Sequence, residues 1–205
     1  METYNKTISS IRNHCNNINY VVKIFLYIFL FVAFSSLIYT IIILIGFKDS
    51  LEVSSFKDDF LISSSNLHFF SGGNISKSLV TYTAEQPFSN IVLAFIISQI
   101  IFLIKQSLVI SIFYYINKIL TNIENNYTPF IIENSKKIKL VGLLIIAYSI
   151  LPNLIAYPLL KLITKGVSLD INSSIPIIFA ASFILLLSKI FTYGCELQKD
   201  SDETL

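Results

Sequence analysis

Four long apolar runs constrain this chain more than any other feature of the sequence. They are Val21–Phe47, Phe88–Leu120, Ile138–Ile163 and Ile175–Tyr193. About 20 apolar residues, each rising about 1.5 Å along a helix, cross a hydrocarbon core of about 30 Å. Every run reaches that length, so the sequence predicts an all-α integral membrane protein with four transmembrane helices.

The composition agrees with a single membrane domain over residues 1–205. Hydrophobic residues make up 54% of the chain and charged residues 14%, with a mean hydropathy of +0.69. Soluble domains seldom combine such values. We expect spans at about 21–47, 88–113, 138–163 and 175–193, the first of them too long for a cleaved signal peptide.

Lys and Arg residues near the span ends predict the orientation, because cytoplasmic flanks carry the excess of them. With the N-terminus inside, nine lie on the cytoplasmic side and five outside, leaving aside Lys105. The inner set is Lys6, Arg12, Lys23, Lys118, Lys136, Lys137, Lys139, Lys189 and Lys199, and the outer set is Lys48, Lys57, Lys77, Lys161 and Lys165. We therefore expect a bacterial inner-membrane protein with both termini cytoplasmic.

The outer loop, residues 48–87, is long enough to hold structure of its own. Residues 67–70 and 75–83 flank Gly72-Gly73, a pattern typical of a β-hairpin with a Gly-Gly turn. An isolated hairpin is marginal in water. We expect it to pack on the outer helix ends or on a second copy of itself.

The second run is longer than a bilayer requires, so we expect its helix to continue to about Asn125 on the cytoplasmic side. One apolar face follows helical spacing through Ile112, Phe113, Ile116, Ile119, Leu120 and Ile123. We expect Asn117, Lys118, Thr121, Asn122, Glu124 and Asn125 on the opposite, polar face. Thr128 can cap a new helix with Pro129 at its first position, which predicts a cytoplasmic helical hairpin whose amphipathic segment covers residues 114–137.

Groups that could catalyse a reaction are scarce. All 13 Asp and Glu residues lie outside the four spans, so the bilayer holds no carboxylate for proton transfer. His14 and His68 are expected on opposite sides of the membrane, and Cys15 and Cys195 as unpaired thiols near its surface. The sequence predicts no enzyme activity, no metal and no cofactor. The net charge of +2 and the single Arg12 argue against a direct nucleic-acid partner.

Four residues form a candidate polar site within the membrane, namely Lys105, Gln99, Pro152 and Asn153. Lys105 could contact an anion or a lipid headgroup, or it could extend its amine to the inner surface near Phe113. The two residues Pro152 and Asn153 could form a kink that lines a small-molecule site, or could simply fit one helix to its neighbours.

Two stretches resemble a known family. The segment from Tyr127 to Asn134, followed by Lys136-Lys137-Ile138 and Gly142, resembles the Pro-Phe-Ser/Thr-x-Glu-Asn segment before the third span of a four-span bacterial family. The ending Gly194–Leu205 resembles its terminal Glu-Leu-x-x-Glu-x-Asp-Leu-Thr-Val pattern. The chain thus resembles the domain of unknown function 2975 family, with Ile131 in place of the usual capping Ser or Thr and Glu203 in place of Leu.

This resemblance implies no activity, but such proteins are commonly encoded beside a very short helix-turn-helix regulator. It suggests a regulatory or sensory protein that binds such a regulator on its cytoplasmic face. The candidate contacts are Pro129, Phe130, Glu133, Asn134, Glu196, Asp200 and Asp202. The alternatives are a small-molecule transporter and an immunity or envelope-stress protein that acts through the outer loop. A homo-oligomer is a further expectation for its partners.

Overall fold

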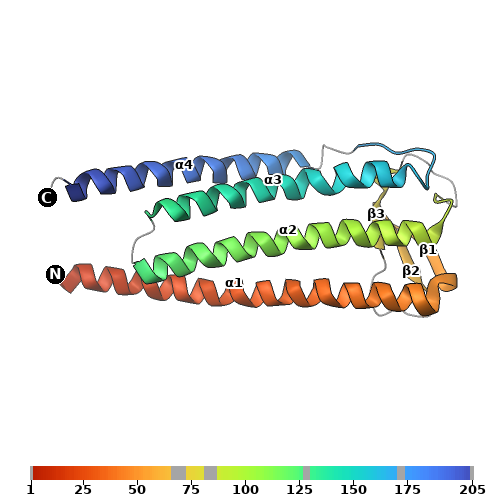
Figure 1. Ribbon diagram of the computed structural model, residues 1–205, viewed down its shortest axis with the longest axis horizontal. Helices are drawn as coiled ribbons and strands as arrows, with labels where there is room; N and C mark the ends of the chain where they lie inside the picture. The colour runs from red at the N-terminus through yellow and green to blue at the C-terminus, as the bar shows by residue number, and fades with distance from the viewer. Residues whose placement is uncertain (1, 66–72, 81–86, 127–129, 170–173, 204–205) are drawn as a thin grey trace. The chain divides into compact units, whose positions relative to one another are not determined.

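The computed structural model describes residues 2–65, 73–80, 87–126, 130–169 and 174–203, with the side chains of residues 2–12, 126 and 202 excepted. It contains four long helices: α1 (Glu2–Ile42), α2 (Ile91–Asn126), α3 (Ile132–Leu160) and α4 (Ile175–Glu203) (Figure 1). All four are long and apolar enough to cross a membrane. This confirms the predicted four long apolar helices as candidate membrane spans, which suggest a multi-pass membrane protein.

The helix ends differ in part from the prediction. Helix α2 does continue to Asn126, but it begins at Ile91, where the Asn90 carboxamide accepts a hydrogen bond from the Leu93 amide at 3.0 Å. Helix α4 continues through the expected tail as far as Glu203. Thr128 and Pro129 lie outside the described residues.

Helix α3 begins at Ile132, and Phe130 and Ile131 before it are not helical. The Ile131 carbonyl accepts the first hydrogen bonds, from Asn134 at 2.9 Å and Ser135 at 3.3 Å. A side chain that cannot accept a hydrogen bond, Ile131, therefore stands at the cap position of α3.

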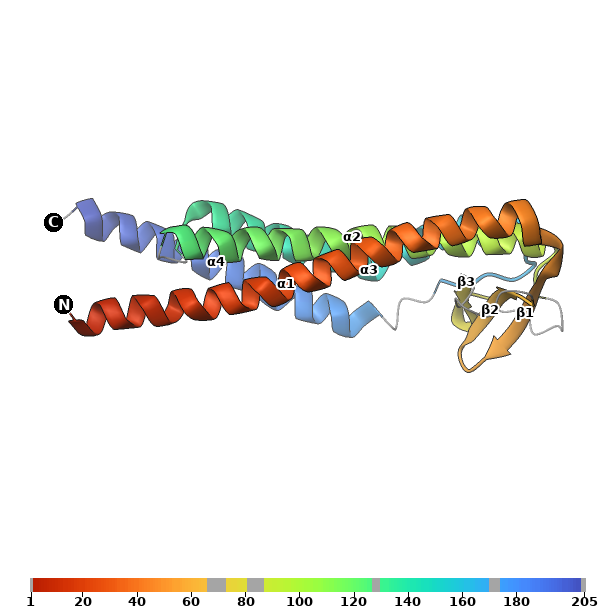
Figure 2. The ribbon, with the colours of Figure 1, turned by 90° about the horizontal axis from the view of Figure 1, so that it is seen from below.

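A small antiparallel sheet lies between α1 and α2 in the sequence. Helix α1 runs into a π-helical turn at Ile43–Phe47, and the strands β1 (Leu51–Phe56), β2 (Asp59–Ser64) and β3 (Gly73–Ser76) follow in the order β1-β2-β3 (Figure 2). Residues 67–72 and 81–83 of the expected Gly-Gly hairpin lie outside the described residues. Gly73 is the first residue of β3 rather than part of a turn, and β3 pairs with β2.

The tight turn of this sheet joins β1 to β2 at Lys57-Asp58. Phe56 pairs with Asp59 across it, and Lys57 adopts a positive φ of 48°. Such a backbone conformation is uncommon outside glycine. No Gly or Asn marks this turn in the sequence, which is why the pattern of turn residues did not reveal it.

The chain forms two compact units. The terminal unit comprises Met1–Leu30, Leu108–Ala147 and Pro176–Leu205, and the sheet unit comprises Phe31–Ser107 and Tyr148–Ile175. The sheet unit contains a buried apolar cluster that includes Ile43 of the π-helical turn, Ile62 of β2, Ile75 of β3, Phe95 of α2 and Leu160 of α3. The sheet therefore packs on helices, as expected.

Candidate functional sites

A groove lies in the terminal unit, where the segment before α3 meets the end of α4. It encloses about 630 Å³ and is lined by Phe130, Ile131, Ile132, Cys195, Glu196, Gln198 and Lys199. The Phe130 and Phe191 ring centroids are 5.5 Å apart. At Gly194 an added Cβ would lie 2.6 Å from the Phe130 ring, so glycine allows the ring to approach the α4 backbone. The two stretches that carry the family resemblance thus contact each other.

Acidic side chains follow one face of α4 beside this groove. Glu196, Asp200 and Glu203 are exposed and are spaced at i, i+4 and i+7, which places them on one side of a helix. Lys199 pairs with Glu203 at 3.5 Å in an exposed salt bridge. The side chain of Asp202 lies outside the described set.

Two other expected contact residues are already engaged within the terminal unit. The Glu133 carboxylate forms a salt bridge with the Lys137 ammonium, with 2.7 Å between Oε1 and Nζ. Asn134 is fully buried and accepts a hydrogen bond from the Asn122 amide at 3.0 Å. Asn134 therefore holds α2 against α3. Among the described side chains of the predicted set, Phe130, Glu133, Glu196 and Asp200 are exposed.

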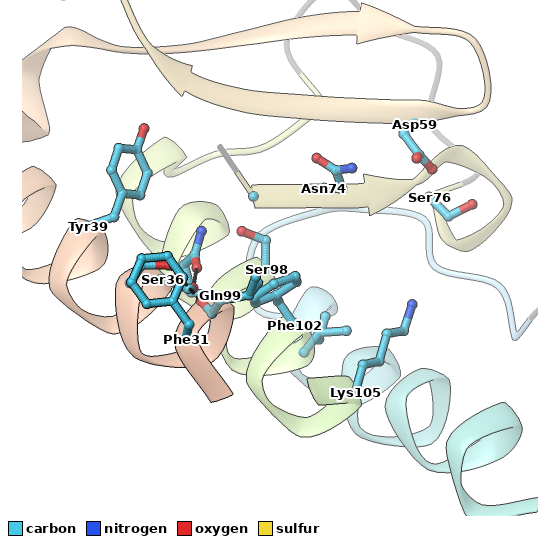
Figure 3. Close-up of a pocket in the computed structure, with 14 residues that line it drawn as sticks. Phe31, Ser36, Tyr39, Asp59, Asn74, Ser76, Ser98, Gln99, Phe102 and Lys105 are labelled. Carbon is cyan, nitrogen blue, oxygen red and sulfur yellow. Dashed lines mark hydrogen bonds between the residues drawn. The ribbon is translucent and has the colours of Figure 1, made fainter. Parts of the chain in front are cut away.

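A second site lies in the sheet unit, where α1, α2 and the sheet enclose a cavity of about 510 Å³. Its apolar residues are Phe31, Val32, Ile101 and Phe102, and its polar and small residues are Ser35, Ser36, Tyr39, Asp59, Gly73, Asn74, Ser76, Ser98, Gln99 and Lys105. Figure 3 shows the Lys105 side chain directed toward the side of the cavity formed by the sheet.

Hydrogen bonds hold the floor of this cavity in place. The Ser36 hydroxyl of α1 donates to the Gln99 carboxamide oxygen of α2 at 3.0 Å (Figure 3). The Ser98 hydroxyl donates to the Phe95 carbonyl within its own helix at 2.6 Å. Gln99 and Ser98 are buried, so their orientation is fixed by packing as well as by these bonds.

Pro152 and Asn153 do not line this cavity. Pro152 is buried within α3, and the helix continues through it to Leu160. Because Pro152 has no backbone N–H, it cannot donate a helical hydrogen bond to the preceding turn of α3. In that turn the Ser149 carbonyl accepts a hydrogen bond from the Ser174 hydroxyl at 2.7 Å. Of the four predicted residues, Lys105 and Gln99 therefore line the same cavity, and Pro152 and Asn153 are not among its lining residues.

Comparison with known proteins gives one family and no individual relative. The family described as "Protein of unknown function (DUF2975)" matches residues 77–205, more than half of the chain. The chain belongs to this family. No curated protein and no solved structure matches it significantly.

The DUF2975 match covers α2, α3 and α4 with both motif stretches, and it leaves α1 and the three strands outside. Sequence reasoning missed Asp59, Ser36 and Asn74 as cavity residues. None of them belongs to a recognisable motif, and only the packing of the sheet on α1 and α2 places them together.

Proposed function

We propose that this DUF2975 protein is a non-enzymatic regulatory protein of the bacterial inner membrane. In this proposal the groove of the terminal unit binds a small basic protein of the cytoplasm, a helix-turn-helix regulator. The observation that carries the proposal is the helical course of α4 to Glu203, because it aligns Glu196, Asp200 and Glu203 beside the groove.

The chemistry of the groove fits such a partner. An amphipathic helix anchors apolar side chains in a groove of this kind, and Phe130 and Ile132, 42% and 50% exposed, offer the matching apolar surface. The acidic face of α4 attracts a DNA-binding protein, whose basic surface it could occupy in competition with DNA. The family resemblance supplies the type of regulator.

The location of the two termini supports a cytoplasmic groove. Both termini and the connection between α2 and α3 belong to the terminal unit. The nine-to-five distribution of Lys and Arg assigns these segments to the cytoplasm.

The test is recovery of partner proteins from bacterial membranes solubilised in mild detergent. The wild-type chain is compared with Glu196→Gln/Asp200→Asn/Glu203→Gln and with a chain that ends at Gly194. We expect both variants to recover less of a small basic protein at low salt. We also expect the wild-type interaction to weaken as salt increases, because exposed charges are screened.

The control variant Glu52→Gln/Asp58→Asn removes acids of the sheet that are likewise exposed. It should recover the partner as the wild type does. Equal recovery by the wild type, the α4 variant and the truncated chain would exclude α4 as the docking element.

A further inference from the structure

Three polar groups face the cavity of the sheet unit without a partner among the described residues. Lys105 and Asp59 both line the cavity, but no ion pair joins them and neither side chain has another partner in the described part of the chain. The Ser36 hydroxyl donates a hydrogen bond to the Gln99 carboxamide oxygen, and the Gln99 amide nitrogen is available as a donor toward the cavity. The cavity thus offers one cation, one carboxylate and one amide donor.

These groups select a zwitterionic ligand. An ammonium and an amide N–H bind the oxygens of a phosphate or carboxylate, while a carboxylate binds an ammonium group. The volume of about 510 Å³ is that of a small-molecule site. Phe31, Val32, Ile101 and Phe102 supply an apolar surface beside the charges, so the ligand also needs an apolar part.

The position of the cavity favours a lipid as the source of this chemistry. Phe31 is 72% exposed, and it lies on a helix long and apolar enough to cross the bilayer. Lys105, also exposed, stands on a second such helix. A lipid could therefore enter from the bilayer with its acyl chain against Phe31 and Phe102, whereas a water-soluble zwitterion would gain nothing from that exposed aromatic surface.

We propose that this cavity binds the headgroup of an ethanolamine phospholipid. Lys105 and the Gln99 amide bind the phosphate, Asp59 binds the ammonium, and the first part of an acyl chain lies against Phe31 and Phe102. The inference does not depend on the proposed protein partner, because its residues all belong to the sheet unit.

The experiment measures the thermal unfolding of the full chain in detergent by circular dichroism, with added dihexanoyl phosphatidylethanolamine. We expect this lipid to raise the Tm more than dihexanoyl phosphatidylglycerol, which lacks the ammonium. Asp59→Asn should abolish that preference. Lys105→Gln should weaken the response to both lipids on the order of tenfold in concentration, as expected for loss of a charged hydrogen bond, and Lys105→Arg should retain much of it.

Matched controls separate the cavity from general charge effects. Glu52→Gln removes an exposed carboxylate of β1, and Lys139→Gln removes an exposed ammonium of α3. Both should respond as the wild type does. Equal Tm shifts with the two lipids in the wild type, or unchanged responses in Asp59→Asn and Lys105→Gln, would overturn the proposal. Larger shifts with leucine or O-phosphoethanolamine would overturn the assignment to a lipid.

Discussion

At the scale of single residues, one glycine determines how closely the sheet approaches α2. A Cβ added at Gly73 would lie 1.4 Å from the Ser98 hydroxyl oxygen, which is far inside any van der Waals contact. Ser98 is 1% exposed and bonded to its own helix, so it cannot move aside without losing that bond. Glycine is therefore needed at position 73 so that β3 can lie close to α2. Gly73 serves this close contact with Ser98 and is not a turn residue.

We predict that Gly73→Ala lowers the free energy of unfolding by about 1–3 kcal/mol, the usual cost of adding atoms to a packed core. Denaturant unfolding in mixed micelles, followed by circular dichroism, measures the change. Gly46→Ala is the control, because a Cβ there would meet nothing within 4 Å. If both substitutions have the same effect, the close contact at Ser98 is not what limits the sheet.

A second residue-scale prediction concerns the polar side chains near the end of α2. Asn117 donates to the Asn19 oxygen at 2.5 Å, Asn19 donates to Thr121 at 3.2 Å, and Asn122 donates to Asn134 at 3.0 Å. The sequence pattern assigned these α2 residues to a polar face opposite the packed one. This interpretation was wrong, since they join neighbouring helices.

Asn122→Asp should therefore destabilise the protein by about 1–3 kcal/mol, because the new carboxylate cannot donate to the buried Asn134. The matched control is Asn125→Asp, at an exposed position of the same helix. The midpoint of thermal unfolding reports the difference, and a neutral Asn122→Asp would restore the view of this residue as part of a solvated face.

At the scale of elements, hydroxyl groups join α3 to α4 within the terminal unit. The Ser135 hydroxyl donates to the Ser188 carbonyl at 2.9 Å, and the Ser188 hydroxyl donates back to the Ser135 carbonyl at 3.1 Å. The Thr192 and Ser135 hydroxyl groups also form a hydrogen bond, with 2.6 Å between their oxygens. Small hydroxyl residues let two membrane helices approach closely while satisfying each other's polar groups.

Ser135→Ala/Ser188→Ala should weaken the pairing of α3 with α4 by about 1 kcal/mol, in the range measured for hydrogen bonds between membrane helices. The loss is measured as a lower free energy of unfolding. Ser182→Ala on α4 should be neutral, since this hydroxyl is exposed and donates its hydrogen bond to the Phe179 carbonyl of its own helix. A larger loss at Ser182 than at the pair would contradict this account.

At the scale of the whole molecule, four spans require both termini to face the same side of the membrane. The three strands follow α1 and precede α2, so we expect them on the opposite side from the termini. We propose, from the Lys and Arg distribution, that the termini are cytoplasmic. The sheet is then expected outside.

This orientation predicts the labelling of intact cells by a thiol reagent that does not cross membranes. A Ser54→Cys variant, with the new thiol at an exposed position of β1, should be modified. The natural Cys15 and Cys195, which are free thiols in the terminal unit, should react only after the cells are opened. Modification of Cys195 in intact cells would reverse the orientation.

The sequence by itself determined the four spans and the continuation of α2 to the end of its run. It also identified the two motif stretches of the family. These features depend on the local composition and periodicity of the chain, because a long apolar helix satisfies its own backbone hydrogen bonds wherever it lies. The family motifs at residues 127–134 and 194–205 were likewise readable as strings of residues.

Only the tertiary structure decided which distant residues meet. The packing of the sheet on α1 and α2 decides three features. They are the Lys57-Asp58 turn, the contact of Gly73 with Ser98, and the shared cavity that Asp59 and Lys105 line. The helical course of α4 past Tyr193 has the same cause, since Phe130 packs over Gly194 there. Contacts between segments far apart in the chain leave no periodic pattern in the sequence. The residues that make such contacts therefore cannot be paired from the sequence alone.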